Sequence, residues 1–229
     1  MLRSSGAVRT WRADPVGDDV IGRVLDDARF APSGGNRQAW RVVVIRDRGQ
    51  RERLGELYRQ VWPEYLAQRD AGLRPFSPAN PAEAEAEAID RVRRGEGPEP
   101  GWFADGIAKA PVMLAVLIEI AEIAAVDRDA GHYPIAGGAS IYPFVQNILL
   151  AARDHGLGGV LTTVLARREQ EVLGVLGAPD GMALATLLVL GYPEGNWPRA
   201  TRRPVAQFAT LDRFDGPAFS ATVSAEIRR

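Results

Sequence analysis

Residues 31–40, Ala-Pro-Ser-Gly-Gly-Asn-Arg-Gln-Ala-Trp, carry the residue types best suited to hold a small molecule. Ser33, Asn36 and Gln38 supply one hydroxyl and two amide groups, which can donate and accept hydrogen bonds. Gly34 and Gly35 allow a positive φ and a close approach of the backbone to a ligand. Such a polar surface without bulky side chains fits the edge of a flat heterocycle.

The elements on both sides of this stretch give it a rigid frame. Pro32 has no backbone donor and disfavours helix at the residue before it, so a preceding helix ends near Ala31. A β-branched run at residues 42–45 predicts a strand directly after the loop. The helix is indicated by apolar residues at helical spacing, namely Val20, Ile21, Val24, Leu25 and Ala28.

Alternating helical and strand patterns predict a layered α/β or α+β core. We expect strands at residues 41–46, 112–118 and 183–190, with a shorter one at 160–163. The last three are continuously apolar, as is typical of strands covered on both faces. We expect further helices at residues 138–155 and 167–176, the second ending at Gly177.

Composition excludes several classes of function. The chain has 229 residues, a formal net charge of −1 and no cysteine, which excludes disulfides, thiolate metal sites and cysteine nucleophiles. His132 and His155 are the two histidines, so a histidine-rich metal site is poorly supplied and no metal is expected. The charge balance argues against a nucleic-acid partner, and no apolar run reaches the roughly 20 residues that span a membrane. We therefore expect one cytoplasmic domain over residues 1–229.

Residues 58–108 differ from the rest of the chain. Here Asn80 is expected to cap a helix with Pro81 at its first position, and acidic residues precede basic ones along it. Breaker-rich stretches at 74–78 and 95–101 flank this helix. The segment is either a lid over a pocket or a plain surface excursion.

Four blocks of the sequence resemble the FMN-dependent nitroreductase family. The first is Gly-Ala-Val-Arg-Thr-Trp at residues 6–11 with Asp-Pro-Val at 14–16, and the second is the loop at 31–40. The third and fourth are residues 146–152 with 156–158, and residues 190–193 with 202–204. The resemblance implies an α+β nitroreductase fold, in which helices flank a central mixed, mostly antiparallel sheet, in an intertwined homodimer.

The resemblance also implies which residues bind FMN. Arg9, Arg202 and Arg203 would contact the cofactor from opposite ends of the chain, and a planar guanidinium suits a phosphate. The chain departs from the family at residues 5–7, where many members carry another cation and a serine. The resemblance also implies a loop that reaches the flavin across the dimer interface, with Pro32, Ser33, Gly34, Asn36 and Gln38. It further implies a backbone segment beside flavin N5, with Leu161, Thr162 and Thr163.

The substrate would meet aromatic residues in or near the 58–108 segment. Trp62 and Trp102 are the better candidates, and His132 and Tyr133 could line the mouth of the site. No catalytic side chain is expected, because a flavin carries the hydride chemistry itself. The implied reaction is ping-pong: NAD(P)H reduces FMN, and a nitroaromatic, quinone or activated alkene is then reduced.

Two other functions stay open on the same scaffold. One is an FMN-dependent dehydrogenase or oxidase that acts on a natural-product intermediate. The other is a catalytically silent flavin-binding protein.

Overall fold

The computed structural model describes residue 2 and residues 5–219, and the chain divides into two compact units, Met1–Pro198 and Arg199–Arg229. The second unit contains the short helix η7 (Val205–Gln207) and a bridge between Thr210 and Ala218. The single domain expected over 1–229 stays a prediction. Within the part of the chain that is described, no helix is both long and apolar enough to cross a membrane.

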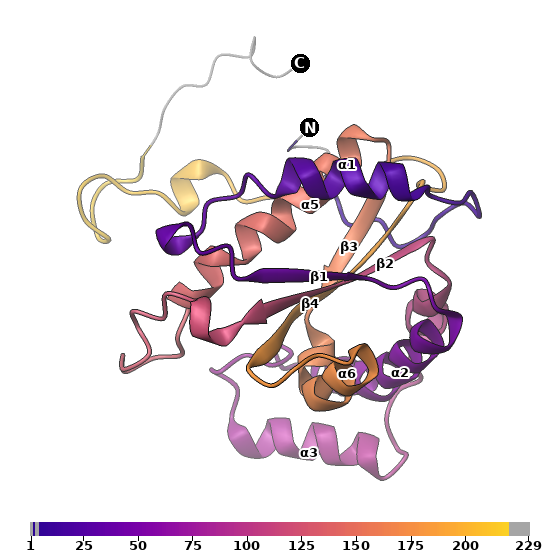
Figure 1. Ribbon diagram of the computed structural model, residues 1–229. Helices are drawn as coiled ribbons and strands as arrows, with labels where there is room; N and C mark the ends of the chain where they lie inside the picture. The colour runs from indigo at the N-terminus through magenta and orange to yellow at the C-terminus, as the bar shows by residue number, and fades with distance from the viewer. Residues whose placement is uncertain (1, 3–4, 220–229) are drawn as a thin grey trace. The chain divides into compact units, whose positions relative to one another are not determined.

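A four-stranded sheet forms the centre of the first unit (Figure 1). Its order is β1 (Trp40–Val44), β2 (Val112–Glu119), β4 (Met182–Gly191) and β3 (Gly158–Thr162), and every neighbouring pair among these is antiparallel. The expected α+β class is confirmed, and the predicted strands lie within two residues of the observed ones. The sheet is antiparallel throughout its four strands, where a mixed one was expected.

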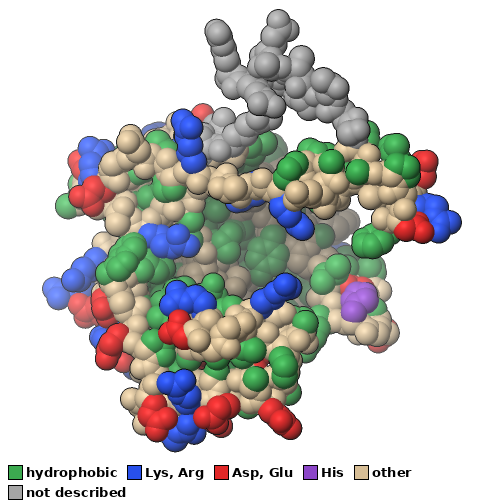
Figure 2. Space-filling view, turned by 180° about the vertical axis from the view of Figure 1, so that it is seen from behind, with side chains coloured by type: hydrophobic (Ala, Val, Ile, Leu, Met, Phe, Trp, Pro, Cys, Tyr) green, Lys and Arg blue, Asp and Glu red, His purple; other side chains and the backbone are tan. Residues whose placement is uncertain are grey.

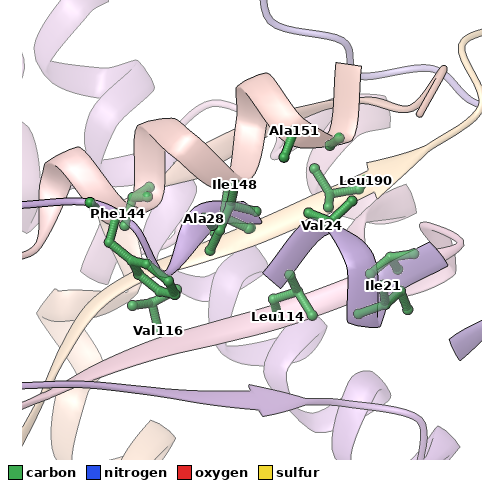
Figure 3. Close-up of a cluster of buried hydrophobic side chains, with 14 of the residues drawn as sticks. Ile21, Val24, Ala28, Leu114, Val116, Phe144, Ile148, Ala151 and Leu190 are labelled. Atoms are coloured by element: carbon green, nitrogen blue, oxygen red, sulfur yellow. The ribbon is translucent and has the colours of Figure 1, made fainter. Parts of the chain in front are cut away.

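Helices α1 (Asp18–Ala28) and α5 (Tyr142–Asp154) cover one face of this sheet (Figure 1). Their apolar side chains pack against the alternate residues of β2 and β4 that point to this face, as the close-up in Figure 3 shows. Phe144 belongs to this core and stacks on Trp40, with ring centroids 4.6 Å apart. The helix expected from residue 138 begins at Tyr142, because residues 136–140 form a 3-10 turn, η5 (Ala136–Ser140).

Helices α2 (Arg48–Asp70), α4 (Gly101–Gly106) and α6 (Glu169–Leu176) supply the core on the opposite face. The Asp47 side chain caps α2 by accepting a hydrogen bond from the Gln50 amide at 2.8 Å. α6 ends at Gly177 with φ of 63°, as predicted. The remaining turns of this unit are η2 (Gly34–Asn36), η3 (Ile107–Lys109), η4 (Ile120–Glu122) and η6 (Val164–Arg168).

The 58–108 segment begins in the middle of α2, where Tyr58 is buried in the core. Its own helix, α3 (Ala82–Arg93), packs against α2. The cap expected at Asn80 is wrong by one residue, because Pro81 occupies the cap position. The Asn80 side chain instead donates to the Arg74 carbonyl at 2.7 Å and closes the turn before the helix.

Candidate functional site

The N-terminal segment attaches to the free edge of β3 and so fixes the position of Arg9. The Val8 amide donates to the Gly159 carbonyl at 3.0 Å, and the Trp11 indole donates to the Gly158 carbonyl at 2.9 Å. Gly159 has no space for a side chain, because an added Cβ would lie 2.3 Å from the Val189 carbonyl oxygen. This glycine therefore permits the close packing that places Arg9 beside β3.

Arg9 reaches toward a group of five aromatic rings, which we call the aromatic cluster: Tyr58, Trp62, Tyr65, Trp102 and Phe103. Tyr58 stacks on Trp62 at 5.6 Å and meets Phe103 edge-on at 6.0 Å. The Arg9 guanidinium lies 5.7 Å from the Phe103 ring centroid, a cation–π distance. Three residues predicted for the site, Arg9, Trp62 and Trp102, thus belong to one neighbourhood.

Tyr58 connects the aromatic cluster with the end of β3. Burial raises the pKa of Tyr58 to about 12, while a side-chain hydrogen bond with Thr162 and the charge of Arg9 act in the opposite direction. Thr162 is buried, and its carbonyl accepts a hydrogen bond from the Thr186 hydroxyl at 3.0 Å. Leu161 is half-buried and Thr163 is exposed. The end of β3 is therefore held on both sides.

The importance of Tyr58 was not predicted from the sequence. It lies at the start of the segment that shows no family motif, among charged residues that hide the apolar face of α2. The one signal that could have indicated it is the helical spacing of Leu57 and Val61 on either side of this tyrosine. All three side chains are buried.

The loop at residues 33–38 is held by hydrogen bonds within the loop and by one to η5. The Ser33 hydroxyl accepts from the Gln38 amide at 2.9 Å, and the Ser140 hydroxyl accepts from the Gly34 amide at 3.0 Å. Asn36 and Gln38 adopt positive φ values of 55° and 53°. Such values are uncommon outside glycine and cluster at ligand-binding loops. Asn36, Gln38 and the neighbouring Pro32 are exposed.

This loop and the aromatic cluster lie at opposite edges of the sheet. The loop precedes β1, whereas Thr162 ends β3, and both β2 and β4 stand between those edge strands. Three interstrand spacings of about 4.8 Å separate the two strands in one chain. Apart from Arg202 and Arg203, the residues predicted to bind FMN are thus brought together in two groups.

His132 and Tyr133 belong to neither group. Both are exposed, and His132 Nδ1 lies 2.8 Å from the Tyr133 carbonyl oxygen. Their loop is held by Asp127, which accepts hydrogen bonds from the Ile135 and Ala136 amides at 2.6 and 2.9 Å. These bonds lower the pKa of Asp127. Tyr133 lines a cavity of about 580 Å³ beside α3, whereas Trp102 lines another cavity.

Arg202 and Arg203 lie in the second compact unit and are exposed. Arg202 donates from Nη1 to the Thr201 carbonyl at 2.9 Å. Their contact with a cofactor stays a prediction.

On the face seen in Figure 2, hydrophobic side chains lie among side chains of both charges. No group of three or more metal-ligating side chains occurs within the described residues.

Comparison with known proteins extends these observations. The chain is 28% identical over 197 residues to 5,6-dimethylbenzimidazole synthase of Rhodospirillum rubrum, covering 83% of this chain and 79% of the relative. It is 27% identical over 205 residues to NADH dehydrogenase of Thermus thermophilus, covering 82% of each. Among solved structures, iodotyrosine deiodinase bound to FMN and 3-iodo-L-tyrosine shares the fold, with a TM-score of 0.64, 20% identity, and coverage of 93% of this chain and 97% of that one. The model of the Nitroreductase family matches residues 3–192, and the chain belongs to that family.

Proposed function

We propose that the protein is an FMN-dependent oxidoreductase that takes electrons from NAD(P)H and reduces a nitroaromatic, a quinone or an activated alkene. Family membership supports the flavin enzyme class. The Thermus thermophilus relative is named for NADH, and the deiodinase structure contains FMN. The observation that carries the proposal is the meeting of Arg9, the aromatic cluster and the end of β3 at one edge of the sheet.

The residues of this edge fit a flavin. The aromatic cluster provides flat apolar surface, and Arg9 provides a cation beside it. The other edge supplies the exposed amide groups of Asn36 and Gln38 on a loop with little bulk. FMN, when bound, supplies the hydride chemistry itself.

The departure at residues 5–7 changes how the phosphate would be held. An added Cβ at Gly6 would lie 2.3 Å from the Pro198 carbonyl oxygen, so a cationic side chain is not accommodated at this position. We therefore assign the phosphate contact to Arg202 and Arg203, and place Arg9 nearer the ring system.

The remaining residues position and shield the reactants. The hydrogen bonds of Thr162 fix the β3 backbone, so that the amides of residues 161–163 can act as preorganised donors. Trp62 and Trp102 would contact the substrate, and the rings around Tyr58 exclude water from that side. No side chain has to transfer a proton for hydride transfer to occur.

We propose further that two copies of the chain complete each site. The loop at 33–38 stands at the wrong edge of its own sheet to meet Thr162, so a loop from a partner would supply Ser33, Gly34, Asn36 and Gln38. An isologous dimer creates two such sites at once.

The experiment is an anaerobic titration of FMN-loaded protein with NADH and with NADPH, followed by an acceptor screen. We expect the visible flavin absorbance to bleach on addition of the donor and to return with the acceptor, with ping-pong kinetics. A protein that takes up no FMN would contradict the proposal. Uptake of FMN without turnover for any pair of donor and acceptor would instead favour a silent flavin-binding protein.

A second candidate is a flavin dehydrogenase or oxidase that acts on a natural-product intermediate. The similarity to 5,6-dimethylbenzimidazole synthase favours this candidate. That relative is named for a product that it synthesises, and its name mentions no nicotinamide donor. If an organic donor reduces the bound flavin but neither NADH nor NADPH does, the result supports this candidate.

A further inference from the structure

We propose that a groove between the N-terminal segment and α4 binds the phosphorylated adenosine end of the electron donor, and that it selects NADPH over NADH. This inference rests on the proposed function. The groove has a volume of about 440 Å³, within the usual range for ligand pockets. Arg9 lines one side of it and also contacts the aromatic cluster, so the groove continues from the proposed flavin site.

The cation best placed for a phosphate in this groove is Lys109. It is the one lysine of the chain, its side chain is exposed, and it forms no ion pair with any described residue. Arg51 donates hydrogen bonds to the carbonyls of Ala108, at 3.1 Å, and Ala110, which flank Lys109 in the sequence. The backbone that carries Lys109 is therefore fixed before a ligand arrives.

Other charges strengthen the attraction for an anion. Arg12 also lines the groove; it pairs with Asp14 at 3.4 Å and lies over the Tyr192 ring at 5.4 Å. The three cations of the groove, Arg9, Arg12 and Lys109, outnumber its two carboxylates, Asp14 and Glu194, so the groove attracts a phosphate monoester, which carries nearly two negative charges.

The base would stack on Trp102. This side chain lines the groove and makes a T-shaped contact with Phe103, with ring centroids 5.8 Å apart. It is 65% exposed, so most of its surface is accessible to a ligand. Indole faces bind nucleobases by stacking. Glu194, on the opposite wall, can accept hydrogen bonds from a ribose hydroxyl or from the exocyclic amine of adenine. NADH lacks the 2′-phosphate that Lys109 would bind, so the groove favours NADPH.

Calorimetric titration of the protein with 2′,5′-ADP, 5′-AMP and inorganic phosphate tests this inference. We expect 2′,5′-ADP to bind about tenfold more tightly than 5′-AMP, as one charge-assisted contact implies. Lys109→Ala should abolish this preference and Lys109→Arg should retain it. Trp102→Ala should weaken both nucleotides alike, and Arg91→Ala, an exposed arginine on α3, is the matched control.

Three results would overturn the inference: equal affinity for the two nucleotides, a preference that survives Lys109→Ala, or inorganic phosphate binding as tightly as 2′,5′-ADP. Thermal unfolding of each variant verifies that it folds. FMN uptake by the same preparation separates the two proposals. Uptake without nucleotide preference refutes the groove alone, whereas absent uptake refutes the proposed function and leaves the nucleotide result to decide the groove.

Discussion

The aromatic cluster and the loop at residues 33–38 are both parts of the proposed site, yet they are built in different ways. The cluster stands on helices, and its central rings, Tyr58 and Phe103, are buried. The loop is largely exposed and has positive φ at Gly35, Asn36 and Gln38. Most of its hydrogen bonds join residues within the loop. Packing holds the first region, whereas local hydrogen bonds hold the second.

This difference indicates a division of labour. A rigid cluster can shape the floor of a site, because close-packed rings resist rearrangement. A loop with satisfied hydrogen bonds and exposed amides can instead meet a surface that belongs to another molecule. In the proposed dimer, the two regions at opposite edges of one sheet would be complementary halves of a site formed by two chains.

The largest effect is expected from mixing two defective chains. Arg9→Ala removes a cation from the cluster side, and a double substitution of Asn36 and Gln38 to alanine removes amides from the loop side. Each homodimer should be nearly inactive, whereas the mixed dimer isolated after co-expression should show about half of the wild-type activity, because one of its two sites is intact. The measurement is the specific activity of doubly tagged, co-purified protein.

Absence of any recovery in the mixed dimers would show that the loop and Arg9 serve a site within one chain. The comparison between the two edges would then lose its functional meaning.

Truncation inside the cluster should affect stability strongly. Phe103→Ala removes a buried ring that contacts Tyr58 and Arg9, so we expect a loss of about 3 kcal/mol in the free energy of unfolding. Its neighbour Trp102 is the matched control, because Trp102→Ala at an exposed ring should change stability by less than about 0.5 kcal/mol. Urea unfolding measures both, and similar losses would mean that the cluster is not supported by packing.

The raised pKa of Tyr58 predicts a dependence on alkaline pH. A group whose pKa is higher in the folded state stabilises the fold below its unfolded pKa of 10.0, and this contribution is lost as the pH rises toward about 12. The free energy of unfolding, measured from about pH 9 to about pH 12, should therefore decline less in Tyr58→Phe than in the wild type. A decline of the same size in both proteins would contradict the burial of the hydroxyl.

The smallest effects concern the backbone of the loop. Gly35 has φ of 62°, so Gly35→Ala should cost about 1 kcal/mol. Gly174, inside α6 and with open space around it, offers the opposite case, and Gly174→Ala should stabilise by about 0.5 kcal/mol. Thermal unfolding of the two variants compares them directly. If Gly35→Ala were neutral, the loop would not be held in the left-handed conformation in solution.

The sequence predicted the sheet better than it predicted the helices. Apolar β-branched runs marked all four strands, because both faces of the central ones are covered. The long helix α2 was not foreseen, since arginine and glutamate surround its buried face at Leu54, Leu57 and Tyr58. The 3-10 turn before Tyr142 was also missed, because glycine and alanine at residues 136–139 carry no periodic signal.

The site was predictable residue by residue but not as an arrangement. Family motifs indicated Arg9 and Thr162, and Trp62 was named for its place in the 58–108 segment. Only the fold shows that the three share a neighbourhood. It likewise shows that Tyr133 lines a different cavity from Trp102. Contacts between residues more than a hundred positions apart depend on strand order, which local patterns do not encode.

The two ends of α3 are anchored unequally, and this bears on how the chain would respond to a protease. Gln68 is fully buried, and its carbonyl side-chain oxygen accepts a hydrogen bond from the Phe76 amide at 2.8 Å. The Arg167 guanidinium lies 5.4 Å from the Phe76 ring centroid. The other end runs through the Gly-Glu-Gly-Pro-Glu-Pro stretch at residues 95–100. Limited digestion should therefore nick the chain within that stretch, and the cleaved helix should remain attached through Phe76.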